Sequence, residues 1–220
     1  MSVRNNLTKL HLEIPPNIKI VAVSKTMPVD IILEAYQAGQ RLFGENKSQE
    51  LITKQPLLPN DIQWHFIGHL QSNKVKYIAP FVGMIESVDS LKLLQEINKQ
   101  AEKHGRVIKC LLQFHIATEE TKFGLDREEA ELLLMSQEFA EMKNVSLCGV
   151  MGMASFTDDE ALIRREFHGL KATQIHLKNK FFRERPEFCE LSMGMTGDYR
   201  IAIEEGSTIV RIGTGIFGQV

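Results

Sequence analysis

Lys25 ends an apolar run and is the first residue whose type and place could do chemistry. Residues 18–26 read IKIVAVSKT, a short and continuous run of β-branched and small apolar residues. Such a run predicts a strand that is buried on both faces. Lysine is rarely buried without a partner, and an ammonium that loses its water becomes a nucleophilic amine more readily. The alternative, a lysine that reaches solvent where the strand ends, stays open from this stretch alone.

Two glycine-bearing segments near the C-terminus have the composition of a phosphate site. Residues 192–198 read SMGMTGD and lead into a helical run, and Ser192 and Thr196 add hydroxyl groups. Residues 209–215 read IVRIGTG. Glycine lets backbone N–H groups approach a ligand closely, and the start of a helix favours an anion. The alternative for the first segment is an ordinary helix cap.

Arg211 lies inside the second of these segments, where a buried guanidinium needs a partner. A structural ion pair would satisfy it. Together with Lys25 and the phosphate site, however, it completes the parts that hold a phosphorylated aldehyde. The lysine forms an imine, the glycine-rich backbone takes the phosphate, and the arginine meets a ring nitrogen or an oxyanion. That set describes pyridoxal 5′-phosphate (PLP); a class I aldolase needs similar parts and an acid/base partner for its lysine.

The elements that must position these residues alternate regularly along the chain. Eight strand-like runs are separated by helical runs, and they cover residues 18–24, 41–44, 62–68, 84–88, 107–114, 146–151, 188–192 and 208–212. This alternation predicts an α/β protein with a parallel sheet and helices outside it. Eight units predict a single closed (β/α)8 barrel over residues 1–220, with a short helix at about 2–13 before the first strand. A doubly wound open sheet is the alternative, weakened by the lack of GxGxxG after the first strand.

A barrel of this kind would bring the distant segments together. Active sites of such barrels lie at the C-terminal ends of the strands, and phosphate sites often use the loops after strands seven and eight. Lys25 follows the first predicted strand, and residues 192–198 and 209–215 follow or end the last two. The fold therefore predicts one shared site at the mouth of the barrel.

Charge and composition exclude several classes of function. The 220 residues carry a net charge of −2 and are 43% hydrophobic, so no basic field indicates nucleic-acid binding. The N-terminal stretch has no apolar run long enough for a signal peptide or a membrane span. We expect a cytoplasmic protein with no membrane association.

Metal binding is not expected. His65 and His69 are four residues apart, a spacing that would align them on a helix, but they flank the end of a predicted strand, so a metal pair is not expected. Cys110, Cys148 and Cys189 show no zinc-like spacing. Each falls in an apolar run, so we expect three buried, reduced thiols.

Several segments match the pattern of a known family. They are AVSK (22–25), FGEN (43–46), WHFIGHLQSNK (64–74), ESVDS (86–90), KFGL (122–125), GVMGM (149–153), LSMGMTGDYRIAIEEGST (191–208) and VRIGTGIFG (210–218). With these segments the chain resembles the pyridoxal phosphate homeostasis protein family, which is related to the N-terminal barrel of alanine racemases. The resemblance runs from about residue 20 to the C-terminus and implies a (β/α)8 barrel that binds PLP.

The resemblance also implies roles for individual residues. Lys25 would carry the Schiff base to PLP, and Arg211 would face the pyridine nitrogen. The residues placed around the phosphate and near the cofactor are Ser192, Thr196, Gly213 and Thr214, with Asn46 beside them. Thr196 stands where the family usually has serine; it keeps the hydroxyl and adds a methyl group that could change its rotamer. No catalytic residue and no metal ligand is implied.

The family is regarded as lacking enzymatic activity and as carrying, buffering or delivering PLP. Apo PLP-dependent enzymes are candidate recipients, which the sequence does not name. The residues favour the same function. A racemase needs two bases, one for each face of the cofactor, and alanine racemases take one from a tyrosine of a further β-rich domain. This sequence ends after the eighth predicted strand, and Tyr36, Tyr77 and Tyr199 all fall in predicted helices.

The predicted cation beside the pyridine nitrogen points in the same direction. Arg211 would disfavour protonation of that nitrogen and so weaken the ring as an electron sink. We therefore expect a PLP-binding regulatory protein without catalytic activity that acts as a monomer. A small PLP-dependent enzyme, such as a weak amino-acid racemase, is the alternative.

Overall fold

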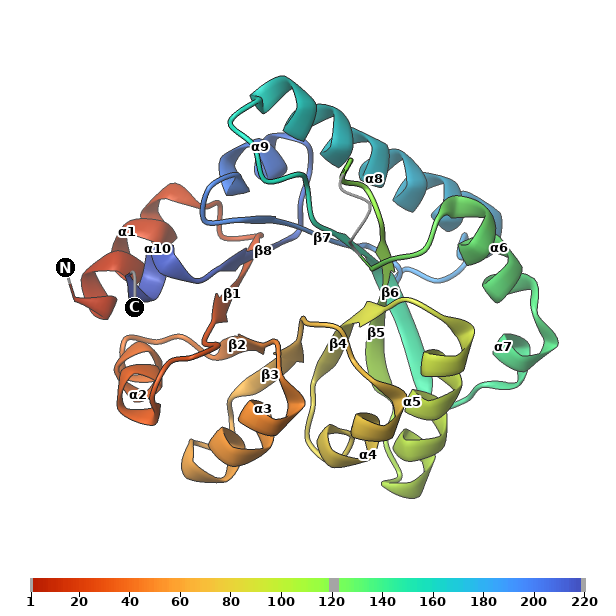
Figure 1. The fold of residues 1–220 in the computed structure, drawn as a ribbon, viewed down its shortest axis with the longest axis horizontal. Helices are drawn as coiled ribbons and strands as arrows, with labels where there is room; N and C mark the ends of the chain where they lie inside the picture. The colour runs from red at the N-terminus through yellow and green to blue at the C-terminus, as the bar shows by residue number, and fades with distance from the viewer. Residues whose placement is uncertain (1, 119–122, 219–220) are drawn as a thin grey trace.

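A computed structural model describes residues 2–118 and 123–218, so that Lys122 of the KFGL segment lies outside the described residues. Eight parallel strands close into a barrel in sequence order (Figure 1). They are β1 (Lys19–Val23), β2 (Leu42–Glu45), β3 (Gln63–Phe66), β4 (Met84–Val88), β5 (Ile108–Phe114), β6 (Val145–Gly152), β7 (Glu190–Met195) and β8 (Ile209–Ile212). The predicted barrel is confirmed, and the closing β1–β8 pair excludes the open sheet.

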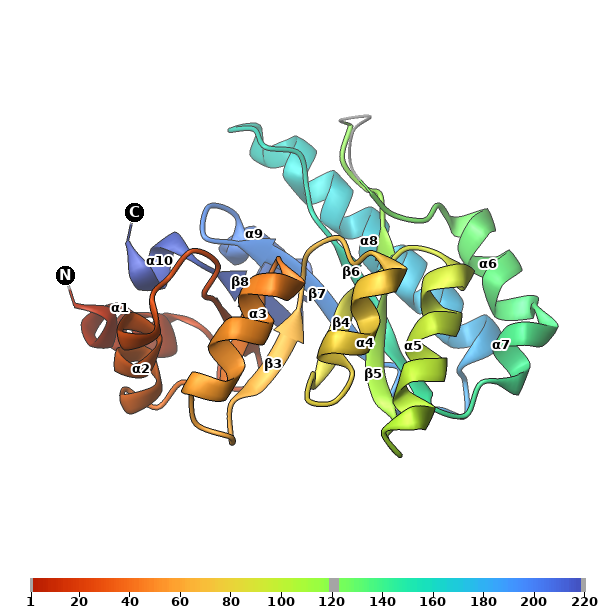
Figure 2. The same ribbon diagram turned by 60° about the horizontal axis from the view of Figure 1, so that its bottom comes forward.

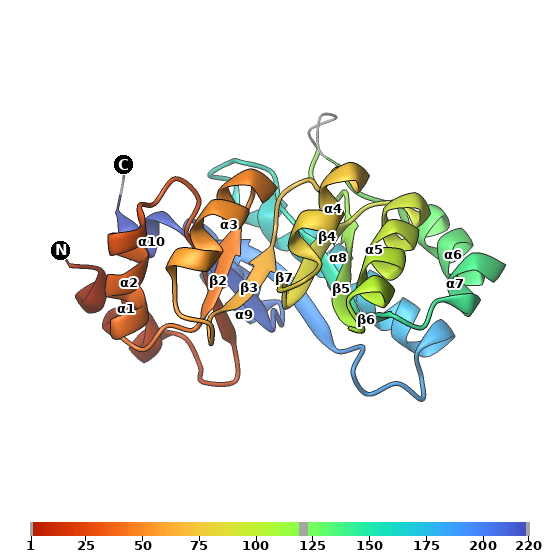
Figure 3. The same ribbon diagram turned by 90° about the horizontal axis from the view of Figure 1, so that it is seen from below.

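Helices surround the barrel on its outside, as Figures 2 and 3 show from two further directions. They are α1 (Val3–Glu13), α2 (Val29–Gln37), α3 (Ser48–Lys54), α4 (Val75–Ile78), α5 (Leu91–Lys103), α6 (Arg127–Met135), α7 (Gln137–Glu141), α8 (Glu160–Phe181), α9 (Tyr199–Glu204) and α10 (Thr214–Phe217). Short 3-10 turns lie at Gln55–Leu57 and Ser72–Lys74. None of the helices in the described ranges is both long and apolar enough to cross a membrane.

Side chains on each strand alternate between the barrel interior and the layer beneath the helices. On β1, Ala22 packs in the outer layer, whereas Val21 belongs to a separate apolar cluster inside the barrel. The other buried members of that inner cluster are Met84, Leu111, Cys148, Met151 and Ile209. Because the period is two residues, Val23 and then Lys25 continue the inward face of β1 toward the barrel mouth.

The seventh strand differs from its prediction. It spans Glu190–Met195 instead of 188–192. Phe188 does not enter the sheet; it is fully buried and stacks on Phe182 with ring centroids 4.1 Å apart. The apolar run at 188 therefore packs beneath the helices, and Ser192 lies in the middle of β7 and not at its end.

The segment between β5 and β6 contains two helices, α6 and α7, because Ser136 adopts an extended conformation and its hydroxyl caps α7 by accepting the N–H of Phe139. One expectation about the cysteines is wrong. Cys110 and Cys148 are buried thiols as predicted, but Cys189 is exposed. It directly precedes β7, at the end of the strand that faces away from the barrel mouth.

Candidate cofactor site

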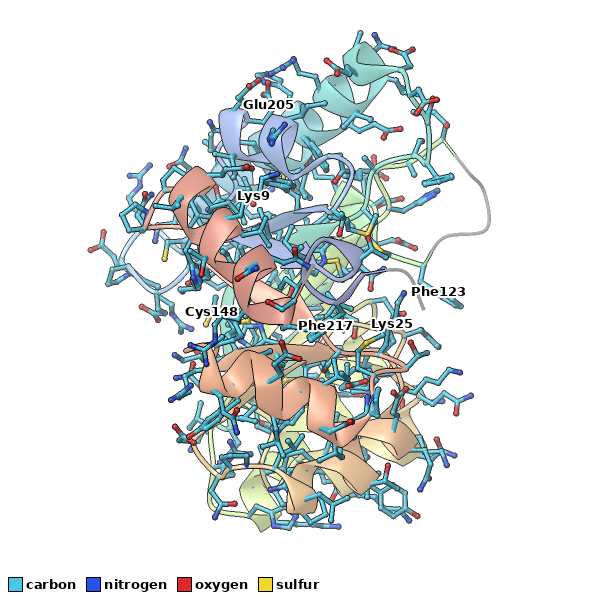
Figure 4. The ribbon with its side chains drawn as sticks, turned by 90° about the vertical axis from the view of Figure 1, so that its left-hand side faces the viewer. Lys9, Lys25, Phe123, Cys148, Glu205 and Phe217 are labelled. Atoms are coloured by element: carbon cyan, nitrogen blue, oxygen red, sulfur yellow. The ribbon has the colours of Figure 1, made fainter. Side chains whose placement is uncertain are left out.

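A pocket of about 550 Å³ opens at the C-terminal ends of the strands. Its lining comes from the segments that follow β1, β2, β3, β6, β7 and β8, and it includes six of the seven predicted site residues: Lys25, Asn46, Thr196, Arg211, Gly213 and Thr214. In Figure 4, Lys25 and Phe123 lie toward the same side of the molecule, and Cys148 lies toward the opposite side. The barrel thus brings residues almost two hundred positions apart to one cavity.

Lys25 lines this pocket from the end of β1. Its side chain is exposed, so burial does not strip water from the ammonium, in contrast to the first possibility raised by the sequence. Within the described part of the chain, no hydrogen bond or ion pair holds that ammonium. Nζ is consequently available to a ligand in the pocket.

Arg211 forms part of the pocket lining and is only 3% exposed. Its Nη1 donates to Ser192 Oγ at 2.6 Å, and its Nη2 donates to the Gly152 carbonyl at 2.9 Å. Burial lowers the pKa of Arg211 below its ordinary value, whereas the charges of Glu86 and Asp198 act in the opposite direction. A guanidinium stays protonated in proteins, so the pocket has a fixed cation in one orientation.

A chain of buried polar groups supports Arg211 from inside the barrel. Ser192 Oγ donates to Glu86 Oε2 at 2.6 Å, and Glu86 Oε2 lies 3.9 Å from Arg211 Nη1. The other oxygen, Glu86 Oε1, is 2.5 Å from His65 Nδ1. The chain runs from β3 through β4 and β7 to β8, directly beneath the pocket.

Glu86 is fully buried and supplies the negative charge of this chain. Burial on its own raises the pKa of Glu86, but the hydrogen bond and charge of His65, the charge of Arg211 and the Ser192 hydroxyl together hold it below its ordinary value. A buried carboxylate with such partners remains ionised and can balance the guanidinium.

Ser192 is the predicted site residue that does not line the pocket. β7 continues three residues past Ser192, so Ser192 lies below the strand end that borders the pocket. Its hydroxyl accepts from Arg211 and donates to Glu86. A contact between Ser192 and a phosphate stays a prediction. The hydroxyl of Ser192 links the two charged side chains in the structure.

The pocket end formed by the segments after β7 and β8 has room for an anion. Gly197 and Gly213 line it, and a Cβ added at Gly197 would meet nothing within 4 Å, while one at Gly213 would meet only Val23 at 3.6 Å. Neither added Cβ would meet another atom at less than ordinary van der Waals distance, so both glycines leave room beside the backbone. Thr196 Oγ1 accepts the N–H of Gly215 at 3.2 Å and keeps its own hydrogen to donate. Glycine backbone and hydroxyl donors are a donor set that suits a phosphate group.

Asn46 is half-buried and lines the pocket from the end of β2. Its backbone is held close to the end of β3 by Gly68, where a Cβ would lie 2.3 Å from the Asn46 carbonyl oxygen. No other residue fits at position 68 without moving one of the two strand ends.

The segment after β6 supplies lining residues that the sequence did not single out as ligands, namely Ser155, Phe156, Thr157 and Asp158. Ser155 is fixed by Glu166 of α8, which accepts its N–H and its hydroxyl at 2.7 Å each. The polar run that follows the sixth predicted strand is the signal that could have found this segment.

His65 and Glu86 were also not predicted as parts of the site. Glu86 interrupts an apolar strand, MIESV, and an acidic residue there requires a buried partner, which is a usable signal. The histidine pair does not converge: His65 bonds Glu86, whereas His69 stacks on Phe123 at 4.0 Å and bonds Asp89. The described residues hold no cluster of metal-ligating side chains.

A barrel with these residues at its mouth belongs to the class of the alanine racemase N-terminal domain. The family model "Alanine racemase, N-terminal domain" matches residues 1–220. An alanine racemase from Clostridium difficile 630 superposes with a TM-score of 0.77 at 16% identity; the alignment covers 100% of this chain and 56% of that chain. At that identity the likeness shows the fold alone, and it covers only part of the full racemase.

Within this class the chain belongs to the pyridoxal phosphate homeostasis protein family. It is 39% identical over 209 residues to the pyridoxal phosphate homeostasis protein of Vibrio alginolyticus, covering 93% of this chain and 87% of that protein. PipY of Synechococcus elongatus PCC7942 is 34% identical, with coverage of 99% of this chain and 100% of PipY. The TM-score is 0.92 to the PipY structure without PLP and 0.88 to the PipY structure with PLP bound.

Proposed function

We propose that this protein binds PLP in the pocket at the barrel mouth and takes part in PLP homeostasis by carrying or buffering the cofactor. One observation carries the proposal: a single pocket is lined by Lys25, by Arg211, and by the phosphate-sized end that contains Thr196 and Gly213. A relative, PipY, whose full length is covered at 34% identity, has been solved with PLP bound. In this chain, the Thr196 hydroxyl and the space beside Gly197 and Gly213 suit the phosphate group of the same cofactor.

Each residue has a defined part in holding PLP. The aldehyde of bound PLP condenses with a primary amine, forming a C=N bond and releasing water, and Lys25 supplies the amine. Thr196, Gly213 and Thr214 receive the phosphate, and Asn46 borders the ring. Arg211 faces the pyridine nitrogen.

The proposal includes the absence of catalysis. Arg211 is a fixed cation, so it disfavours protonation of the pyridine nitrogen and the electron-withdrawing chemistry that protonation permits. The tyrosines lie elsewhere: Tyr36 bonds Asp61, Tyr199 bonds Glu13, and Tyr77 is exposed on α4. None of the three lines the pocket, so no tyrosine of this chain is placed to act as the second base that racemisation requires.

Borohydride trapping tests the attachment residue. It reduces the C=N bond to a stable amine, and peptide mapping of the reduced protein should place PLP on Lys25. Lys25→Ala should abolish the label and the yellow colour. Lys47→Ala is the matched control, since Lys47 is an exposed lysine at the end of the adjacent strand that does not line the pocket. Label that persists in Lys25→Ala would disprove this attachment.

Two assays separate a carrier from an enzyme. The PLP-loaded protein should show no saturable turnover with a panel of L- and D-amino acids; turnover that Lys25→Ala abolishes would favour the weak racemase. Transfer of PLP to an apo PLP-dependent enzyme should be compared with free release, because faster transfer indicates direct delivery. Recipient enzymes, a cytoplasmic location and a monomeric state stay predictions from the sequence.

A further inference from the structure

Lys25 lies in a tight turn between β1 and α2. The turn spans residues 24–27 and is closed by the Met27 N–H, which donates to the Ser24 carbonyl at 3.0 Å. Its third residue, Thr26, has a φ of 65°. Glycine normally fills such a turn position, and a β-branched residue there is a genuine outlier. A strained conformation of this kind persists only where its surroundings hold it.

Helix α3 provides the group that holds Thr26. Glu50 Oε1 accepts the N–H of Thr26 at 2.6 Å. The same oxygen accepts Lys54 Nζ at 2.5 Å, one turn further along α3. The strained residue directly after Lys25 is therefore bonded to a charged pair on a neighbouring element.

Lys54 fixes the other end of the turn. It is only 7% exposed, and its ammonium donates to the Ser24 carbonyl at 2.7 Å and to Glu45 Oε1 at 2.8 Å, besides Glu50. Ser24 Oγ also donates to Glu45 Oε1, at 2.7 Å. All three hydrogens of the ammonium are thus used. None of these side chains lines the pocket, so the network acts on the backbone that carries Lys25.

We propose, on the basis of the proposed attachment of PLP to Lys25, that Glu50 and Lys54 are positioning residues which hold the 24–27 turn in its left-handed form and thereby present the Lys25 amine to the pocket. Without the Glu50 carboxylate, Thr26 returns to the negative φ values that a threonine prefers, and the direction of Lys25 changes. The fraction of molecules competent to bind PLP falls, and the apparent affinity falls by the same factor.

Glu50→Ala tests the proposal in the whole protein. The rate at which the C=N bond forms is followed by visible absorbance after PLP is mixed with the PLP-free protein, and the dissociation constant is measured in parallel. We expect the rate and the affinity each to fall about tenfold, since left-handed strain at a non-glycine residue corresponds to about a decade in an equilibrium constant. Glu50→Gln, which keeps an acceptor and the side-chain volume, should give a smaller loss and serves if the alanine variant does not fold.

A rescue distinguishes positioning from general stability. Glycine adopts a positive φ without strain, so adding Thr26→Gly to Glu50→Ala should restore at least about half of the lost rate. Glycine also raises the entropy of the unfolded chain, so the same double variant should be no more resistant to heat than Glu50→Ala. Recovery of the linkage rate without recovery of thermal stability is a pattern that a merely structural role would not produce.

Glu131→Ala is the matched control. The Glu131 side chain is 20% exposed against 22% for Glu50, and it pairs with Lys180 at 2.8 Å on the outer helices. It should lose a comparable ion pair without slowing PLP linkage. Lys54 is not substituted, because its removal would leave the buried Glu45 unpaired and would unfold the region.

The positioning role would be overturned by a Glu50→Ala variant that links PLP as fast as the wild type, or by a slow variant that Thr26→Gly does not rescue. Equal slowing by Glu131→Ala would also contradict it. A wild-type protein that takes up PLP without a bond to Lys25 would instead refute the proposed function, and borohydride mapping of the wild type separates that case from the others.

Discussion

At the scale of single residues, the site depends on charges that balance one another inside the barrel. Arg211 is a cation with almost no exposure, and Glu86, on the opposite side of Ser192, is the buried anion that compensates it. Breaking a buried pair by removing one member leaves an uncompensated charge, which costs about 3–5 kcal/mol. Glu86 therefore supports the pocket although it does not line it.

Glu86→Gln should reveal this role through its pH dependence. The folded-state pKa of Glu86 lies below its ordinary value of 4.5, so its contribution to stability is fully present above pH 4.5 and is lost as the pH falls through the folded-state value. Urea unfolding between pH 7 and pH 3 should show a less steep loss of stability on the acid side in Glu86→Gln than in the wild type. At pH 7 the variant should be less stable by about 3 kcal/mol or more.

Glu184→Gln, on the exposed loop before β7, is the control for that experiment. It should unfold as the wild type does at every pH. An acid limb that is unchanged in Glu86→Gln would mean that the carboxylate is not ionised in the folded protein.

Residue types revealed part of this site from the sequence. Lys25 and Arg211 could be found because charged residues in or after apolar strands require an explanation. Glu86 stands in the same kind of strand, but its partner Ser192 is 106 positions away, and only the closed barrel shows that they meet. The Thr26 conformation has no signal in residue type, since threonine is not typical of that backbone region.

At the scale of elements, close approach between strand ends determines where the pocket residues lie. Gly68 lets the end of β3 contact the backbone of Asn46, and a Cβ there would come within 2.3 Å of the Asn46 carbonyl oxygen. Any substitution must separate the ends of β2 and β3. The position of Asn46 in the pocket depends on this one glycine.

Gly68→Ala should accordingly lower both stability and PLP affinity. Overpacking of this kind costs about 1–3 kcal/mol, and thermal unfolding together with PLP titration would measure the two effects. Gly169→Ala is the opposite case, because Gly169 lies within α8 and an added Cβ meets nothing within 4 Å. It should stabilise the protein by about 0.5–1 kcal/mol without changing PLP affinity. Equal effects of the two substitutions would contradict the close approach at Gly68.

The elements themselves were predictable to within a few residues, with one consequential exception. Alternation of apolar runs located all eight strands, because strands and helices have different periods. The run at 188 was assigned to the sheet, but Phe188 packs on Phe182 beneath the helices and the strand begins at Glu190. Apolarity indicates burial and does not tell which buried layer a residue joins, so Ser192 was placed at the wrong point along its strand.

At the scale of the whole molecule, the pocket exists only while the closed sheet is folded, because strand ends from around the barrel form it. The pocket receives residues from β1, β7 and β8 and from the segments that follow β2, β3 and β6. No subset of the strands can form it alone. A ligand that bridges these ends should therefore stabilise the fold as one unit.

PLP should raise the midpoint of thermal unfolding, since a ligand at about 100 times its dissociation constant adds about 2.7 kcal/mol. Trp64 is the single tryptophan of the sequence and is buried against Phe43 on the outward side of β3. The unfolding midpoint followed by Trp64 fluorescence and the midpoint followed by far-ultraviolet circular dichroism of the protein should rise by the same amount when PLP is added. Separate midpoints for the two signals would show that the barrel does not unfold as a unit.

The position of Cys189 provides a labelling site for testing whether PLP is transferred directly to an acceptor enzyme. All three cysteines lie in the described part of the chain, and burial raises the pKa of the Cys110 and Cys148 thiols, which keeps them protonated and unreactive. Cys189 is exposed at the start of β7, on the end of the barrel opposite the pocket. A maleimide dye or a surface tether would attach there in a single orientation with the barrel mouth facing outward. Docking of an acceptor enzyme at the mouth could then be recorded on a protein whose anchor leaves that face unobstructed.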